Sequence, residues 1–155
     1  MKYLEPLVPV LRRLEADYDF DFQVISNRPP SFSLRSLVYR PWKKETEIPD
    51  LLQFHVGVMP LEEDPWAKGK CAFKALQYMA LGIPALVSPV GMNTEVVVHG
   101  HNGYLCATEE DWFTYLQHLL SEENLRAKMG RSARTSIVAR YSVKANRENF
   151  LGLFR

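Results

Sequence analysis

The stretch KGKCAFKALQYMALGIP, from Lys68 to Pro84, decides the fold that we expect for this chain. It follows the apolar segment FHVGVMP at residues 54–60, which predicts a strand. Within the stretch, apolar residues recur at helical spacing and predict a helix from about Ala72 to Leu81. Gly82 ends this helix, and Pro84 prevents its continuation. A strand, a short turn that contains lysines and a helix therefore follow one another here.

The turn before this helix has the composition of an anion site. The first N–H groups of a helix have no partner within the helix, and the helix dipole places a partial positive charge beside them. A phosphate group can bind at such a helix start. Lys70 and Lys74 add full positive charges at this position. We therefore expect an anionic ligand near the start of the helix, and the structural alternative is a pair of solvated lysines.

Short apolar segments alternate with amphipathic ones along the rest of the chain. Strands are expected at residues 20–26, 36–40, 54–59, 85–88 and 103–106. Helices are expected at residues 4–16, 48–53, 93–98, 109–120, 122–140 and 142–154, with Thr108 and Ser121 capping the two longest. No hairpin signal separates consecutive strands, so the pattern predicts parallel pairing through right-handed crossovers. The expected class is α/β, a Rossmann-like open parallel sheet flanked by helices, with ligands at the carboxyl ends of the strands.

Composition limits the classes of function. The 155 residues, 46% of them hydrophobic, suit one globular domain spanning residues 1–155. A formal charge of +1 and the lack of a long basic run argue against a nucleic-acid partner. Cys71 and Cys106 are not in metal-binding spacing and are typical of reduced thiols. No apolar run reaches the roughly 20 residues of a spanning helix, and no signal-peptide pattern is present, so we expect a cytoplasmic domain.

Several motifs occur in a fixed order after residue 51: LQYMALGIP at residues 76–84, VGMNTE at 90–95 and NGYL at 102–105. With the acidic loop and glycine turn that precede them, they resemble the signature of one family. From Leu51 to Arg140, the chain resembles the C-terminal, donor-binding domain of retaining GT-B glycosyltransferases of the group 1 type. The resemblance implies a sugar transferase that holds a nucleotide-diphosphate sugar between this domain and an N-terminal acceptor-binding domain.

The resemblance also implies which residues contact the donor. The backbone amides of Ala72 and Phe73 would bind the distal phosphate beside Lys70 and Lys74, and Gln77 would reach the ribose. Other matched positions are Arg40 and Trp42 for the base, and Gly91, Met92, Asn93 and Glu95 for the sugar. No metal and no cofactor is implied, and the catalytic residues stay unknown. A parent protein of this kind would work on glycan or lipid-linked acceptors, with peripheral membrane association as a further expectation.

The chain departs from the family pattern in two ways. The two glutamates of the family motif fall on Gly69 and Gln77, so Glu63 or Asp64 would have to supply a carboxylate for the sugar. The family's opening strand and glycine-rich turn have no counterpart, because the chain begins in a helix. We therefore expect a fragment of a two-domain chain, with a gap in the sheet beside the third strand. The exposed strand edges would permit a homodimer.

Two other functions remain open from the sequence. The missing glutamates are compatible with a non-catalytic nucleotide-binding or interaction module that kept the fold. A domain related to sugar-nucleotide epimerases would share the architecture. His99 and His101 flank Gly100 with no evident third ligand, so this segment is interpreted as a turn and not as a metal site.

Overall fold

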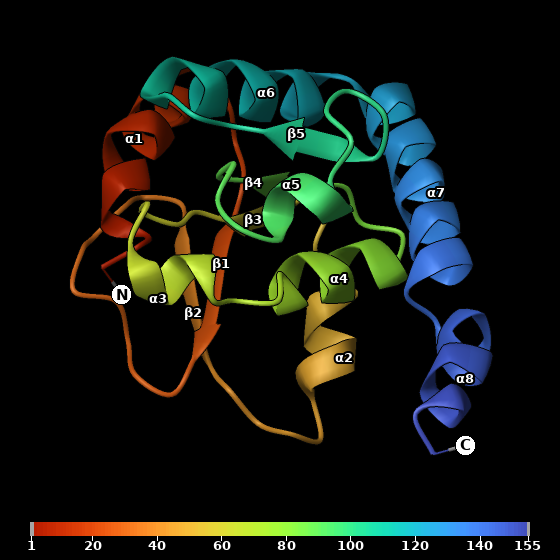
Figure 1. Ribbon diagram of the computed structural model, residues 1–155. Coiled ribbons are helices and arrows are strands. Elements are labelled where there is room, and N and C mark those ends of the chain that lie inside the picture. Colours follow the sequence, from red (N-terminus) through yellow and green to blue (C-terminus); the bar gives the residue numbers. More distant parts are fainter. Residues whose placement is uncertain (1, 155) are drawn as a thin grey trace.

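The computed structural model describes residues 2–154, in which short strands alternate with helices (Figure 1). The strands are β1 (Phe22–Ser26), β2 (Leu37–Pro41), β3 (Gly57–Met59), β4 (Ala85–Val87) and β5 (Gly103–Leu105). The chain enters through a short 3-10 helix (Glu5–Leu7). The α-helices are α1 (Val8–Asp17), α2 (Glu47–Leu51), α3 (Pro65–Lys68), α4 (Phe73–Ala80), α5 (Asn93–Val96), α6 (Glu109–Ser121), α7 (Glu123–Arg140) and α8 (Val143–Gly152).

All strand pairs are parallel, which confirms the predicted α/β class. β1 pairs with β2, and β4 lies between β3 and β5. Met59 lies opposite Val87, and Val87 lies opposite Leu105, so these three strands end at the same edge. The loops that could hold a ligand follow this edge.

Helices cover the strands on two faces, each with its own apolar core. Side chains of α1 and α6 pack with Phe22, Val24 and Leu86 in one cluster. Side chains of α4 and α7 pack with Ala85 and Val87 in the other. Successive strand residues point to opposite faces, so β1 and β4 divide their side chains between the same two layers of helices. Figure 1 shows α6 along the top of the view with α1 at its left end, and α5 in front of β4 with α4 below it.

The sheet is broken between β1 and β3, beside the third strand, as the sequence predicts. A cavity of about 590 Å³ separates these two strands and is lined by both of them. Apolar side chains from both helix layers also reach it, among them Leu7, Leu119 and Tyr78. Within residues 2–154, the Oε1 atom of Gln23 on β1 is buried and has no hydrogen-bond partner. We call this cavity the strand gap.

The helix ends differ from the sequence expectation in two places. Thr108 caps α6 as predicted, in a capping box with Asp111. The prediction that Ser121 caps α7 was wrong. Helix α6 continues through Ser121, and α7 begins at Glu123 without a side-chain cap. The short helix α3 was not predicted from the sequence; Asp64 caps it by accepting a hydrogen bond from the N–H of Ala67, and its first residue is Pro65.

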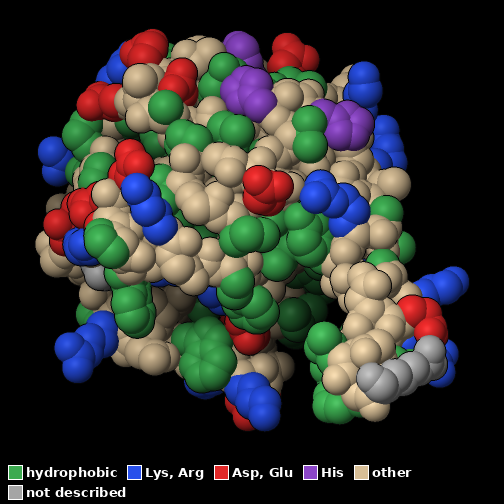
Figure 2. All heavy atoms as spheres, viewed as in Figure 1, with side chains coloured by type: hydrophobic (Ala, Val, Ile, Leu, Met, Phe, Trp, Pro, Cys, Tyr) green, Lys and Arg blue, Asp and Glu red, His purple; other side chains and the backbone are tan. Residues whose placement is uncertain are grey.

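The C-terminal helix carries an exposed apolar surface. Phe150, Leu153 and Phe154 are all exposed, and the rings of Phe150 and Phe154 are in contact. Figure 2 shows hydrophobic side chains on α8 across a hollow from the body of the molecule. Within residues 2–154, no helix has both the length and the apolar composition to cross a membrane.

Candidate functional site

The start of α4 presents free backbone donors at the carboxyl edge of β3. The first hydrogen bond of this helix runs from the N–H of Leu76 to the carbonyl of Ala72, so the N–H groups of residues 73–75 precede the helical ladder. No side chain of residues 2–154 accepts a hydrogen bond from them. Ala72 has a left-handed backbone, with φ of 55°, which is uncommon for a residue other than glycine. Within the described residues, the start of α4 therefore has no side-chain cap that an anion would have to displace.

The two predicted lysines lie on different sides of this helix start. The ammonium of Lys70 stands 4.2 Å from the centre of the Tyr3 ring. The ammonium of Lys74 instead binds the carboxylate of Glu47 at 3.2 Å and the side-chain oxygen of Gln77 at 2.9 Å. Lys70 is therefore the lysine of this pair that has no carboxylate partner among the ion pairs of the described residues. The charge of Lys74 is compensated by Glu47.

Glu47 gathers residues from three separate segments. Its Oε1 atom accepts hydrogen bonds from Lys74 and, at 3.2 Å, from the Nε2 atom of Gln77. These bonds, with a smaller contribution from the Trp42 side chain, hold the pKa of Glu47 below its usual value. Trp42, Glu47 and Lys74 also line the rim of the strand gap. The structure thus brings Trp42, Lys74 and Gln77, three of the predicted donor-binding residues, together around the carboxylate of Glu47, which was not predicted from the sequence.

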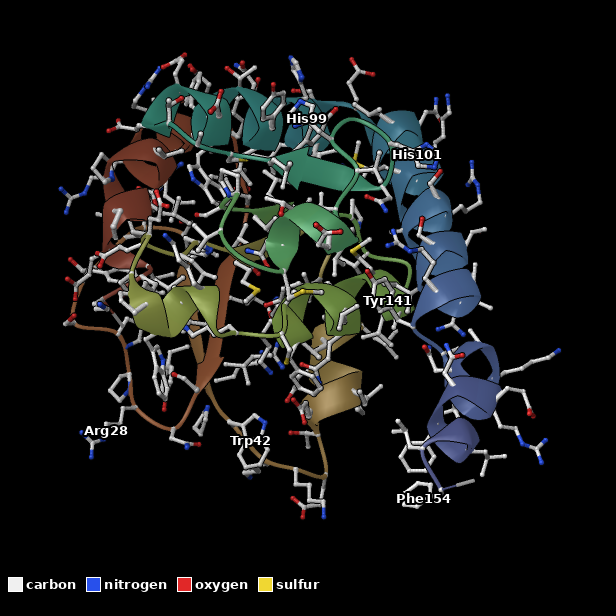
Figure 3. All side chains as sticks on the ribbon, viewed as in Figure 1. Arg28, Trp42, His99, His101, Tyr141 and Phe154 are labelled. Carbon is white, nitrogen blue, oxygen red and sulfur yellow. The ribbon has the colours of Figure 1, made fainter. Side chains whose placement is uncertain are left out.

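No pattern in the sequence would have found Glu47. It stands 27 residues before Lys74 and 30 before Gln77, and the only local signal is an acidic residue in the first turn of a short helix. Arg40, predicted near the base, lies close to this group and forms an ion pair with Asp50 of α2 at 3.4 Å. Figure 3 shows Trp42 at the lower end of α2, far from His99 and His101 on the turn before β5.

The acidic loop after β3 is used mainly for structure. Asp64 accepts the N–H of Ala67 at 2.6 Å and so caps α3, and it also binds Lys2 and Tyr3. The N–H of Ala67, and then Lys2, lower the pKa of Asp64 below its ordinary value. Glu63 is exposed and forms an ion pair with Lys68 at 3.0 Å. Of these two carboxylates, Glu63 is the one with freedom to meet a ligand.

The loop after β4 lies against the segment that leads to α4. Gly91 has φ of 54°, and a side chain there would stand 2.8 Å from the carbonyl oxygen of Lys68. Asn93 is buried, and its amide donates to the carbonyl of Ser88, so its side chain holds the loop. Met92 is 40% exposed, and Glu95 is also exposed.

A second cavity, of about 420 Å³, opens at the carboxyl edge of the β3–β4–β5 sheet. It is lined by the loops after these strands, including Glu63, Val90 and Thr108, and by Tyr3 at the entry of the chain. Loops distant in sequence thus surround one hollow beside the segment that leads to α4, as expected for the ligand edge of a parallel sheet. Within residues 2–154, no group of three or more His, Cys, Asp or Glu could hold a metal ion.

Residues 42–136 match the family described as glycosyl transferases group 1. The chain belongs to this family. It is similar to N-acetyl-alpha-D-glucosaminyl L-malate synthase of Bacillus anthracis, with 31% identity over 100 residues, which are 63% of this chain and 25% of that protein. The group 1 domain described here therefore spans a quarter of the length of that relative.

Solved structures show the same fold for this group 1 domain. It superposes on Staphylococcus aureus TarM, solved with UDP among its ligands, with a TM-score of 0.77 and 17% identity, covering 99% of this chain and 33% of TarM. It also resembles the C-terminal domain of the group 1 protein LpcC from Francisella tularensis, with a TM-score of 0.59 and 19% identity over 70% of this chain and 55% of that one. These likenesses confirm the predicted C-terminal GT-B architecture.

Proposed function

We propose that this domain binds the nucleotide-diphosphate sugar donor of a retaining glycosyltransferase. The observation that carries the proposal is the start of α4, where uncapped N–H groups follow β3 and Lys70 comes shortly before them in the sequence. A diphosphate fits this position because it is anionic and accepts several hydrogen bonds. TarM, a structural neighbour, was solved with UDP.

The chemistry proposed for this site is stabilisation of the leaving diphosphate. As the bond to the sugar breaks, negative charge grows on the diphosphate, and fixed donors directed at that charge lower the barrier. The backbone N–H groups of residues 73–75 and the ammonium of Lys70 would supply these donors. The proposal includes no metal ion and no cofactor.

Turnover would require a second domain. We propose that an acceptor-binding domain of the parent protein supplies the acceptor site and completes the cleft, and that this chain alone does not transfer sugar. The acceptor, a glycan or a lipid-linked molecule, would meet the donor at the carboxyl edge of the β3–β4–β5 sheet.

A non-catalytic nucleotide-binding or interaction module is the second candidate. Gly69 and Gln77 stand where the family pattern has carboxylates, and Asp64 is already bound to Lys2, Tyr3 and the start of α3. These observations favour a fold that has lost part of its donor recognition.

Calorimetry separates the two candidates. We expect UDP, GDP or ADP to bind this chain more tightly than the matching nucleoside, because only the diphosphate reaches the start of α4. Replacing Lys70 by alanine should weaken the diphosphate about fivefold to tenfold and leave the nucleoside unchanged, in line with a charge-assisted hydrogen bond. Lys68→Ala is the matched control, since Lys68 is an exposed lysine of the same segment that pairs with Glu63. No binding of any of the three nucleotides at millimolar concentration would favour the interaction module.

A further inference from the structure

Glu47 lies one helical turn beyond the proposed phosphate position. Lys74 and Gln77 are three residues apart, so their side chains project from one face of α4. Both reach the same carboxylate oxygen of Glu47, and Lys74 also binds Gln77, so the three side chains form a closed hydrogen-bonded triangle. A ligand that extends from the start of α4 along this face meets the triangle next.

The carboxylate retains capacity for a ligand. Its side chain is 22% exposed, and the bonds from Lys74 and Gln77 both end on Oε1. An ionised carboxylate offers about four acceptor positions, and these two bonds together with the one from the Trp42 side chain do not fill them. Gln77, Lys74 and Trp42 hold the pKa of Glu47 below its usual value, so the group is charged at neutral pH. The triangle therefore presents a fixed, charged acceptor.

A nucleoside diphosphate has paired hydroxyls next to its phosphates, on the ribose. A helix rises about 5.4 Å per turn, so a phosphate at the start of α4 places the ribose near Lys74 and Gln77. Trp42, beside Glu47, is 41% exposed and offers a flat apolar surface next to the ribose position.

We propose that Glu47 accepts the 2′- and 3′-hydroxyls of the donor ribose and makes the site selective for ribonucleotides. This assignment rests on the donor-binding function proposed above. Lys74 and Gln77 act as positioning residues, because their hydrogen bonds fix the carboxylate. The carboxylate thus comes from α2, on a segment distant in sequence from the helix that carries Lys74 and Gln77.

The test compares UDP with 2′,3′-dideoxy-UDP by calorimetry on the whole chain. The unmodified protein should bind UDP about tenfold more tightly, as expected for hydrogen bonds to a charged acceptor. In Glu47→Gln the two affinities should come within about threefold of each other, mainly through weaker UDP binding, since a neutral amide is a poorer acceptor. Glu45→Gln is the matched control, because Glu45 is an exposed glutamate two residues away, and it should keep the tenfold ratio.

Each outcome decides the assignment. If Glu47→Gln weakens both nucleotides equally, Glu47 only supports the fold of the site, and the assignment is wrong while donor binding stands. The assignment is also wrong, while donor binding stands, if the unmodified protein binds the two nucleotides with equal affinity. If the unmodified protein binds neither nucleotide, the donor-binding function and the ribose assignment are both overturned. Thermal unfolding of each variant shows whether a loss of affinity comes from a loss of folding.

Discussion

Gly130 lies where α7 crosses the turn that ends α4. A side chain at this position would collide with the carbonyl oxygen of Gly82, which is backbone and cannot rotate away. We expect Gly130→Ala to destabilise the fold by about 2 kcal/mol, because overpacking at a tight contact outweighs the better helix propensity of alanine. Gly152→Ala is the control, since nothing lies within 4 Å of a side chain added there. Urea unfolding of both variants measures the difference, and equal stability would contradict the close α4–α7 contact.

At this scale the sequence predicted neighbours along one helix better than contacts between distant segments. Helical spacing alone placed Lys74 and Gln77 on one face of α4. Glu47 was missed because its contact with them depends on how α2 packs, which no local pattern encodes. The contact of the Lys70 ammonium with the Tyr3 ring, near the start of the chain, was missed for the same reason. Contacts of this kind are set by tertiary packing.

Two carboxylates near helix ends, Asp111 of α6 and Glu15 of α1, accept hydrogen bonds that favour their ionised form. The N–H of Thr108 and then its hydroxyl hold the pKa of Asp111 below 3.8, and the hydroxyl and N–H of Ser36 hold the pKa of Glu15 below 4.5. A carboxylate whose pKa is lower in the folded than in the unfolded protein stabilises the fold at pH values above its unfolded-state pKa. This stabilisation is lost as the pH falls through the folded-state pKa. We expect stability to be level above about pH 5 and to fall below pH 4.

Urea unfolding at pH 7 and at pH 3 measures this dependence. In Asp111→Asn the loss between the two pH values should be smaller than in the unmodified protein, because one of the titrating groups is gone. The variant should also be less stable at pH 7, since the capping box of α6 loses its charged member. If the loss of stability between pH 7 and pH 3 is the same in this variant as in the unmodified protein, Asp111 does not contribute to the pH dependence of stability.

The order and type of the main elements could be predicted, whereas their boundaries could not. Short apolar segments predicted the position of each described strand, but β3 begins at Gly57 and not at Phe54, because pairing with β4 starts only at Gly57. Thr108 was a reliable cap because Asp111 follows at the capping-box spacing. Ser121 lacked such a partner residue. The short α3 was missed because one turn of helix has too few residues to show periodicity.

At the scale of the whole molecule, the two sheets behave as parts of one layer with a strand gap between them. Both share the same helix layers, and the facing edges of β1 and β3 line one cavity. The position of the strand gap could be predicted from the sequence. Its depth could not: the cavity extends from the α1–α6 layer to α4. The homodimer through an exposed sheet edge stays a prediction.

Hydrogen exchange tests the strand gap. In a parallel strand, backbone N–H groups point alternately to the two neighbours, so a strand paired on one side leaves half of them free. We expect fast exchange for part of β1 and β3, and strong protection throughout β4, which is paired on both sides. Protection of β1 and β3 that rises with protein concentration would support the homodimer. Protection equal to that of β4 in dilute protein would contradict an open gap.

We expect a diphosphate to bind at the start of α4. Adding UDP to ¹⁵N-labelled protein and recording amide spectra tests it most directly, because the proposed ligands are themselves backbone N–H groups. We expect the largest shifts at residues 72–75, with smaller shifts around Glu47 and Trp42. Binding without any shift at residues 72–75, or with the largest shifts elsewhere, would contradict it.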